Sequence, residues 1–252
     1  MGSGPYPRSI DFSPPAAPEP SREEARTDLL ALVFLQRAGA TGTAAGVIGG
    51  LVGVYALLEL GATLETATSG ASPSPPFLAS AGFLDLGLLL ILLGGTLQMA
   101  GMGWYLLAFR TLRNDDLDFE GPALRISVGL FSIPIFLLSF AMLEVSLVAF
   151  ANCANSLPAG STLAVSCSSQ TTNLQAWGLF AFTSAAPTLF GLWGVLWGVW
   201  RLEAHFDGSS FQLAAILLFL AFLPFAVAIG SLLVWTESHK LAARPVRRAR
   251  PT

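Results

Sequence analysis

The chain has 252 residues, of which 53% are hydrophobic and only 12% are charged, and its mean hydropathy is +0.64. About a quarter of the residues of a soluble globular domain are charged, so this composition excludes a soluble domain and favours a membrane protein. The net charge of −3 and the absence of a basic stripe interleaved with aromatic residues exclude nucleic-acid binding. The chain therefore predicts an all-α, polytopic transmembrane helix bundle.

The N-terminal segment is predicted to be a disordered tail over residues 1–22. The first 27 residues hold six prolines and no apolar run, which is not typical of a cleaved secretory signal. Residues 23–36 then predict an amphipathic lead-in helix lying at the membrane interface. Arg37 interrupts the apolar run, and we expect its side chain to snorkel to the headgroups where a first span over about 38–60 begins.

Four further apolar segments are long enough to cross roughly 30 Å of hydrocarbon. They give a bundle of about five spans within residues 23–238, followed by a basic tail over 239–252, and the additional spans cover about 80–109, 122–150, 175–200 and 211–235. Pro134 and Pro224 fall inside two of these spans, where a proline frees a backbone carbonyl and permits a kink.

The distribution of Lys and Arg predicts the orientation of the spans. The loops 61–77 and 151–174 contain neither residue, whereas the N-terminal flank and the short loops 111–121 and 201–210 are bordered or occupied by arginines. We expect the protein in the plasma membrane. The positive-inside rule then predicts that the amino terminus and the short loops are cytoplasmic. Because the number of spans is odd, the basic tail is expected outside, against the same rule.

Cys153 and Cys167 are the only cysteines, and both lie in the uncharged loop assigned to the outside. An oxidising exterior allows them to form a disulfide, which would close a loop of about 15 residues and stabilise the fold by roughly 3 kcal/mol. Two unpaired small residues are the alternative.

Glycines at four-residue spacing predict where helices approach closely. The first span carries Gly42, Gly46 and Gly50, and the fourth carries Gly194 and Gly198. Packing within this bundle is one explanation, and homodimerisation through the first span is the other. An aromatic belt with a cationic stop is predicted at the cytoplasmic interface. It consists of Trp193, Trp197 and Trp200, with Arg201 directly after them.

Three acidic side chains lie in or next to the apolar segments, namely Glu59, Asp85 and Glu144. The predicted topology places all three toward the outer leaflet, with Gln98 nearer the middle of the second span. An unpaired acid at that depth tends to be protonated or to bind a cation, so these residues form a possible intramembrane polar site. Headgroup-level solvation is the alternative for Glu59 and Asp85, and structural hydrogen bonding is the alternative for Glu144.

Motifs for catalysis and metal binding are missing from the sequence. The run from Asp116 to Gly121 imitates half of a calcium loop but has Ser127 where a bidentate Glu is needed, so it predicts a solvated turn. The two histidines, His205 and His239, are placed on opposite sides of the membrane by the five-span topology. No catalytic residue, cofactor or metal site is therefore predicted, and we do not expect an enzyme.

The segment 200–235 resembles the last hairpin of an archaeal family of multi-pass membrane proteins of unknown function. The matching residues are Trp200-Arg201-Leu202-Glu203, Phe206-Asp207, Ser209, Pro224 and Ile229-Gly230. The resemblance covers about a seventh of the chain, and the glycine that this family often has between the positions of Leu202 and Glu203 is missing here. It implies an archaeal plasma-membrane protein and supplies no activity or site residues.

Two hypotheses of function follow from these observations. The first is a non-enzymatic structural or accessory subunit that assembles through its glycine faces, with membrane lipids and a homo-oligomer or larger membrane complex as its partners. The second is a small cation- or proton-coupled transporter or channel that uses the intramembrane acids. Convergence of those acids on one cavity would favour transport, and their dispersal would favour the subunit.

Overall fold

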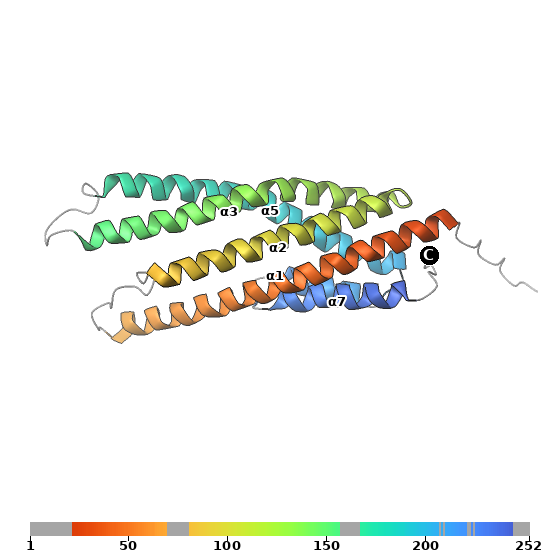
Figure 1. The fold of residues 1–252 in the computed structure, drawn as a ribbon, viewed down its shortest axis with the longest axis horizontal. Coiled ribbons are helices and arrows are strands. Elements are labelled where there is room, and N and C mark those ends of the chain that lie inside the picture. The colour runs from red at the N-terminus through yellow and green to blue at the C-terminus, as the bar shows by residue number, and fades with distance from the viewer. Residues whose placement is uncertain are drawn as a thin grey trace, which may run out of the picture.

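The computed structural model describes residues 22–69, 81–156, 167–206, 208, 210–220, 223 and 225–243, with backbone only for 22, 53, 55–69, 81–88, 151 and 154–155. This part of the chain is all-helical, as the sequence predicts. Its elements are α1 (Arg22–Ser69), α2 (Ala81–Arg113), the 3₁₀ turn η2 (Leu117–Phe119), α3 (Glu120–Asn155), α5 (Ser168–Phe206), α6 (Phe211–Phe219) and α7 (Ala226–Ala242). Figure 1 shows the long helices running alongside one another as an elongated bundle.

Four helices of the described part are long and apolar enough to cross a membrane. These candidate spans are Glu23–Val52, Leu89–Arg113, Leu117–Phe150 and Ser168–Phe206. They lie in α1, α2, α3 and α5 and correspond to the first four predicted spans. A multi-pass membrane protein is therefore the architecture that the fold supports.

The predicted division between an interfacial lead-in helix and a first span is wrong, because α1 is a single helix of 48 residues. Ala31, Leu32 and Leu35, which belong to the supposed lead-in, are completely buried. Their apolar face is therefore covered by the rest of the bundle and not by the membrane interface. The guanidinium of Arg37 lies 4.8 Å from the centre of the Trp104 ring on α2, so the charge is accommodated without a break in the helix.

The predicted fifth span is also wrong, because the segment 211–235 does not form one helix. It contains the nine-residue α6 and most of the 17-residue α7, separated by the segment 220–225. At Gly230 of α7 a side chain would meet Ala214, Leu217 and Leu218 of α6, while Gly208, just before α6, lies near Glu237 late in α7. The two helices therefore form an antiparallel hairpin.

Helix α7 packs antiparallel to the first half of α1 (Figure 1). The neighbours along the two helices are Gly50 with Phe225, Gly46 with Ala228, Gly42 with Ser231, Gly39 with Trp235 and Gln36 with Ser238. The end of α7 therefore lies at the same end of the bundle as the start of α1. His205 and His239, which the five-span topology separates, lie at this end as well.

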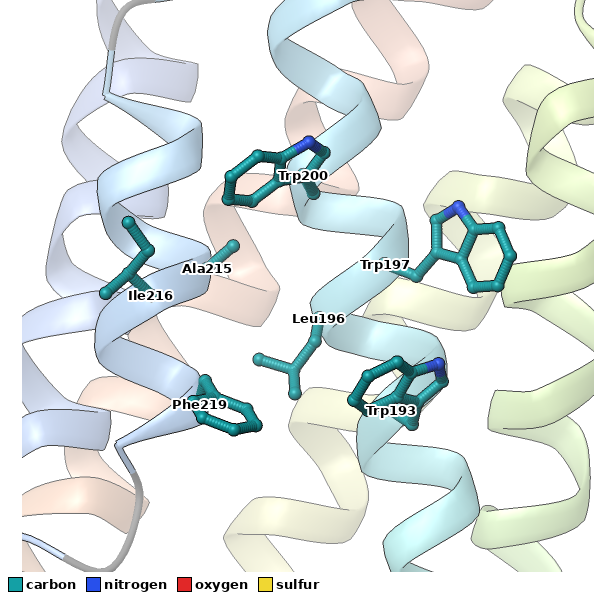
Figure 2. Close-up of a pocket in the computed structure, with 7 residues that line it drawn as sticks. All are labelled: Trp193, Leu196, Trp197, Trp200, Ala215, Ile216 and Phe219. Carbon is teal, nitrogen blue, oxygen red and sulfur yellow. The ribbon is translucent and has the colours of Figure 1, made fainter.

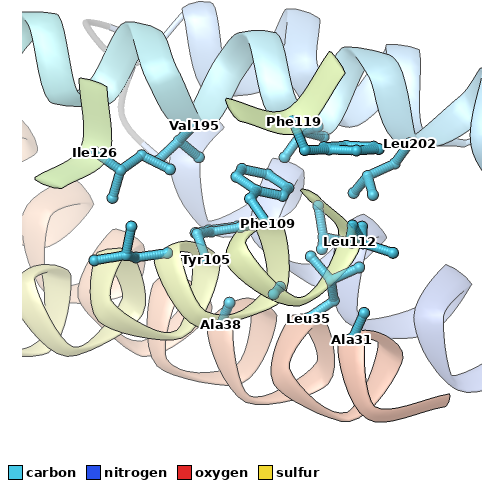
Figure 3. Close-up of a cluster of buried hydrophobic side chains, with 14 of the residues drawn as sticks. Ala31, Leu35, Ala38, Tyr105, Phe109, Leu112, Phe119, Ile126, Val195 and Leu202 are labelled. Atoms are coloured by element: carbon cyan, nitrogen blue, oxygen red, sulfur yellow. The ribbon is translucent and has the colours of Figure 1, made fainter. Parts of the chain in front are cut away.

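The main hydrophobic core lies in the half of the bundle that contains the α2–α3 connection and the end of α5 (Figure 3). Phe109, Phe119, Leu112 and Leu202 are all completely buried there. The rings of Phe109 and Phe119 stack with centroids 5.6 Å apart. Every helix of the described chain contributes residues to this cluster, although the far halves of the long helices do not. The cluster fixes the hairpin of α6 and α7 against the candidate spans.

The predicted glycines pack inside this chain. Gly42, Gly46 and Gly50 face α7, and a side chain at Gly50 would overlap the ring of Phe225. Gly194 faces Pro122 and Arg125 of α3, and Gly198 faces the ring of Phe109. The interpretation as intramolecular packing is confirmed for these five positions, and α7 already covers the face of α1 that a homodimer would have used.

The cysteines form the predicted disulfide, with their Cα atoms 6.1 Å apart. Cys153 lies near the end of α3 and Cys167 directly precedes α5. The bond therefore ties these two helices together at the end of the bundle opposite the core. Nearer the core, the backbones of α3 and α5 approach one another at Gly129 and Gly191, where neither position has room for a side chain.

Candidate functional site: a cavity beside the α6–α7 hairpin

A cavity of about 200 Å³ lies where the hairpin of α6 and α7 meets α1, α2 and α5. Sites for small molecules are typically concave and mostly apolar, with a few polar groups that converge on the ligand. This cavity has that character. Its lining residues are Gly42, Gln98, Gly101, Met102, Tyr105, Leu192, Val195, Leu196, Leu218, Val227 and Ser231.

Three side chains supply the polar part of the lining. Tyr105 is 96% buried, and its hydroxyl has no hydrogen-bond partner in the structure. Leaving a buried hydroxyl unpaired costs roughly 1–3 kcal/mol. Ser231 is also buried, and Gln98 is partly buried. The cavity therefore holds unused hydrogen-bonding capacity that water or a ligand would satisfy.

Helical spacing brings these groups together. Gln98, Met102 and Tyr105 recur at intervals of four and three residues, so they share one face of α2. Gly101 lets α1 approach closely, since a side chain there would come within 3.2 Å of the Thr41 hydroxyl. Val227 and Ser231 lie one turn apart near the start of α7, and Leu218 lies near the end of α6.

The hairpin interrupts the helical backbone beside the cavity. Phe225, the residue before α7, has φ = 64°, a left-handed conformation that costs about 1–2 kcal/mol for a bulky residue. Its ring fills the space over Gly50, so contact with α1 supports this conformation. Helix ends inside a membrane leave backbone groups without intrahelical partners, and such interrupted helices are typical of substrate sites in transporters.

The predicted intramembrane acids do not gather at this cavity among the residues described. Glu144 on α3 is partly buried but does not line the cavity. The side chains of Glu59 and Asp85 lie outside the described residues. Of the two predicted polar residues whose side chains are described, Gln98 lines the cavity and Glu144 does not. Gln98 lies there with Tyr105 and Ser231, which were not predicted from the sequence.

Arginines stack on tryptophans in the half of the bundle where α1 begins, and we call this region the arginine level. Arg125 stacks on Trp197 with its guanidinium carbon 4.2 Å from the ring centre, and Arg201 lies 5.4 Å from the same ring. Arg37 and Trp104 form the equivalent pair between α1 and α2. In membrane proteins, cations and tryptophans of this kind concentrate at the boundary between headgroups and hydrocarbon.

The α6–α7 hairpin extends past the arginine level along α1. Phe225 lies beside Gly50, and the α1 segment from Arg37 to Gly50 is about 20 Å long at 1.5 Å per residue. The hydrocarbon layer is roughly 30 Å thick. The turn between α6 and α7 therefore lies about 20 Å along α1 from Arg37, and the cavity, which Gly42 lines, lies between these two positions.

A second hollow, a groove of about 530 Å³, lies on the outer surface between α5 and α6. We call it the tryptophan groove. Its lining residues are Trp193, Leu196, Trp197, Trp200, Ala215, Ile216 and Phe219 (Figure 2). Leu196 lines both the tryptophan groove and the cavity, so this side chain is part of the wall between them. The predicted aromatic belt is thus one wall of a groove.

A buried polar cluster joins three elements beyond the arginine level. The His205 Nε2 atom lies 3.3 Å from a carboxylate oxygen of Asp28, and Nδ1 lies 3.5 Å from Asp116. Asp28 is completely buried. The cluster connects the start of α1, the turn before η2 and the end of α5. The one sequence signal for it was an acid, Asp28, inside the apolar face of the supposed lead-in helix.

The described residues contain no group of three or more His, Cys, Asp or Glu side chains arranged to hold a metal ion. No protein-family model, no curated protein and no solved structure matches the chain. We therefore infer function from the geometry of the cavity and of the groove.

Proposed function

We propose that this chain is a non-enzymatic integral membrane protein that binds, and carries through the membrane, a small neutral molecule with a hydrogen-bonding group. The convergence of Gln98, Tyr105 and Ser231 on one cavity carries this proposal. The unpaired Tyr105 hydroxyl supports a ligand because it leaves a buried group to be satisfied. No carboxylate occurs among the described lining residues, which favours a neutral molecule over a cation.

The position of the cavity supports passage through the membrane. It lies just inside the headgroup level and beside an interrupted hairpin, where small changes in the tilt of α6 and α7 would open a route. Leu196 separates it from the tryptophan groove. Rotation of that side chain would let a molecule dissolved in the bilayer enter between α5 and α6.

The orientation that accompanies this proposal follows from the hairpin. All 13 Lys and Arg residues lie at the end of the bundle where α1 begins or in the tails attached to that end. By the positive-inside rule we assign this end, the amino terminus and the basic tail to the cytoplasm. The return of α7 removes the conflict between the tail and the rule.

The accessory or structural subunit predicted from the glycines remains a proposal without a described interface. Gly42, Gly46 and Gly50 are covered by α7, so an assembly would have to use other surfaces. Coupling to a cation or proton through Glu144 has no support from the cavity, because Glu144 does not line it.

Access to the cavity can be measured with a matched pair of cysteine variants. Ser231 lines the cavity, whereas Ser238, two turns later on the same face of α7, is equally buried and does not. N-ethylmaleimide is a small neutral reagent, and the native cysteines are disulfide-bonded. We expect the Ser231→Cys variant to react in the folded protein and the Ser238→Cys variant to react only after unfolding.

Ligands can then be found by protection. Neutral amides, alcohols and phenols small enough for the cavity are added before the reagent, and those that bind should slow labelling of Ser231→Cys. Gln98→Leu or Tyr105→Phe should abolish that protection, while Thr96→Val, which removes an exposed hydroxyl from the same helix, should not. If Ser231→Cys were as inert as Ser238→Cys, the cavity would be closed to small molecules and the proposal would fail.

A further inference from the structure

The tryptophan groove has the surface of a site for a hydrocarbon chain. Among the described lining residues the only polar side-chain atoms are the indole nitrogens. Trp193 and Phe219 are 50% and 60% exposed. Figure 2 shows them at one end of the groove, with Trp200 and Ala215 toward the other. The α5 segment from Trp193 to Trp200 is about 10 Å long, which matches part of an acyl chain.

One end of the groove lies at the headgroup level. Trp197 lines the groove, and the guanidinium groups of Arg125 and Arg201 both lie over its ring. Arg125 also lies 5.6 Å from the centre of the Phe190 ring. A molecule that lies along Trp193 and Trp197 therefore passes two cations.

The charges around Trp197 favour an anionic headgroup. Arg201 forms an ion pair with Asp118 on η2. Arg125 has no carboxylate partner among the described residues, and its Nη1 atom is buried without a hydrogen bond. The two arginines and one aspartate leave a net positive charge at this point, which a phosphate would balance.

A transmembrane helix fits this groove less well than a lipid does. Helices associate in membranes through small residues that permit close backbone approach, but Ala215 is the only small residue among the described lining residues, beside three tryptophans and Phe219. The aromatic walls and the cationic end instead match the two parts of a phospholipid. We infer that the tryptophan groove with Arg125 and Arg201 is a binding site for one anionic phospholipid.

Quenching of tryptophan fluorescence by brominated lipids tests this site in the full chain. The variant Trp104→Phe/Trp177→Phe/Trp235→Phe keeps only the three groove tryptophans, and Trp193→Phe/Trp197→Phe/Trp200→Phe reports on the others. Each is reconstituted in phosphatidylcholine containing increasing fractions of brominated phosphatidylglycerol or brominated phosphatidylcholine. We expect half-quenching of the groove tryptophans at about a fivefold lower fraction of brominated phosphatidylglycerol than of brominated phosphatidylcholine. This is the preference that one unpaired cation confers.

Charge variants assign the preference to the arginines. In the variant that keeps the groove tryptophans, Arg125→Gln/Arg201→Gln should remove the preference. Arg113→Gln, which neutralises an exposed cation at the end of α2, should leave it unchanged. If the double variant does not fold, the comparison of the two lipids with the native arginines decides the question alone.

Four results would overturn the inference. They are equal quenching by the two lipids, a preference that survives Arg125→Gln/Arg201→Gln, displacement of the anionic lipid by inorganic phosphate, and no quenching by either lipid. The last result would mean that protein, such as a second copy of the chain, covers the groove.

Discussion

The α3–α5 hairpin and the α6–α7 hairpin begin at the same end of the bundle and end differently. α3 and α5 have 36 and 39 residues and are closed by a disulfide at the far end. α6 and α7 have 9 and 17 residues and turn back beside Gly50 of α1. Both are apolar, so hydrophobicity alone does not decide whether a hairpin crosses the membrane.

Proline does not explain the difference by itself. Pro134 and Pro187 lie inside α3 and α5, which continue through them. Pro224 falls between α6 and α7, outside the described residues. The second hairpin differs in its packing contact with α1, where Gly46 and Gly50 make room for Ala228 and Phe225. A tertiary contact thus supports the interruption.

The largest predicted loss of stability concerns this contact between α7 and α1. A Cβ atom at Gly46 would overlap the backbone of Ala228, so we expect Gly46→Ala to destabilise the protein by about 3 kcal/mol. Gly49→Ala is the control because no atom lies within 4 Å of its added Cβ, and its stability should change by less than about 1 kcal/mol. Unfolding in mixed dodecyl maltoside and SDS micelles measures both. Equal losses would show that α7 does not pack on this face.

The disulfide should matter almost as much at the far end of the α3–α5 hairpin. Cys153→Ser/Cys167→Ser is expected to lower the free energy of unfolding by about 2–3 kcal/mol, because the bond restricts the unfolded chain. Reduction of the wild-type protein with dithiothreitol should give the same loss in the same unfolding assay. An unchanged transition after verified reduction would contradict this prediction.

The polar cluster connects the start of α1 to the turn before η2 and to the end of α5. Asp28→Asn keeps the shape of the side chain but removes the charge facing His205, so we expect a loss of about 2 kcal/mol. Glu23→Gln, at an exposed position in the first turn of α1, is the control and should change stability by less than about 0.5 kcal/mol. A loss in the control as large as that of Asp28→Asn would mean that the cluster has no special role.

The smallest predicted effect has the opposite sign. Tyr105→Phe removes a buried hydroxyl that has no partner, so the ligand-free protein should become more stable by up to about 1 kcal/mol. The thermal unfolding midpoint measures this change. A loss of stability would mean that ordered water already satisfies the hydroxyl.

Much of the fold could be predicted from the sequence, because long apolar segments report directly on helices that can cross a membrane. The disulfide followed from two cysteines in one uncharged loop, and the packing role of Gly42, Gly46 and Gly50 followed from their spacing. The continuity of α1 through Arg37 could not be predicted, since the Trp104 ring that accepts this charge comes from another helix.

The candidate site was less predictable. Gln98 was identified as a polar residue within a span, but Tyr105 and Ser231 resemble ordinary membrane residues until α7 folds back against α1. The return of α7 depends on contacts between residues far apart in the sequence, such as Gln36 with Ser238, 202 positions later, and no local pattern encodes them. The resemblance of residues 200–235 to an archaeal membrane family stays a prediction.

The central claim is that α6 and α7 enter the membrane and return to the side from which they started. Single cysteines introduced by Ser3→Cys and Thr252→Cys test it in right-side-out and inside-out vesicles with a membrane-impermeant maleimide, since the native cysteines are disulfide-bonded. We predict that both positions are labelled in the same vesicles, the inside-out ones. Labelling of Thr252→Cys from the side opposite Ser3→Cys would show that the last segment crosses the membrane and would contradict the hairpin.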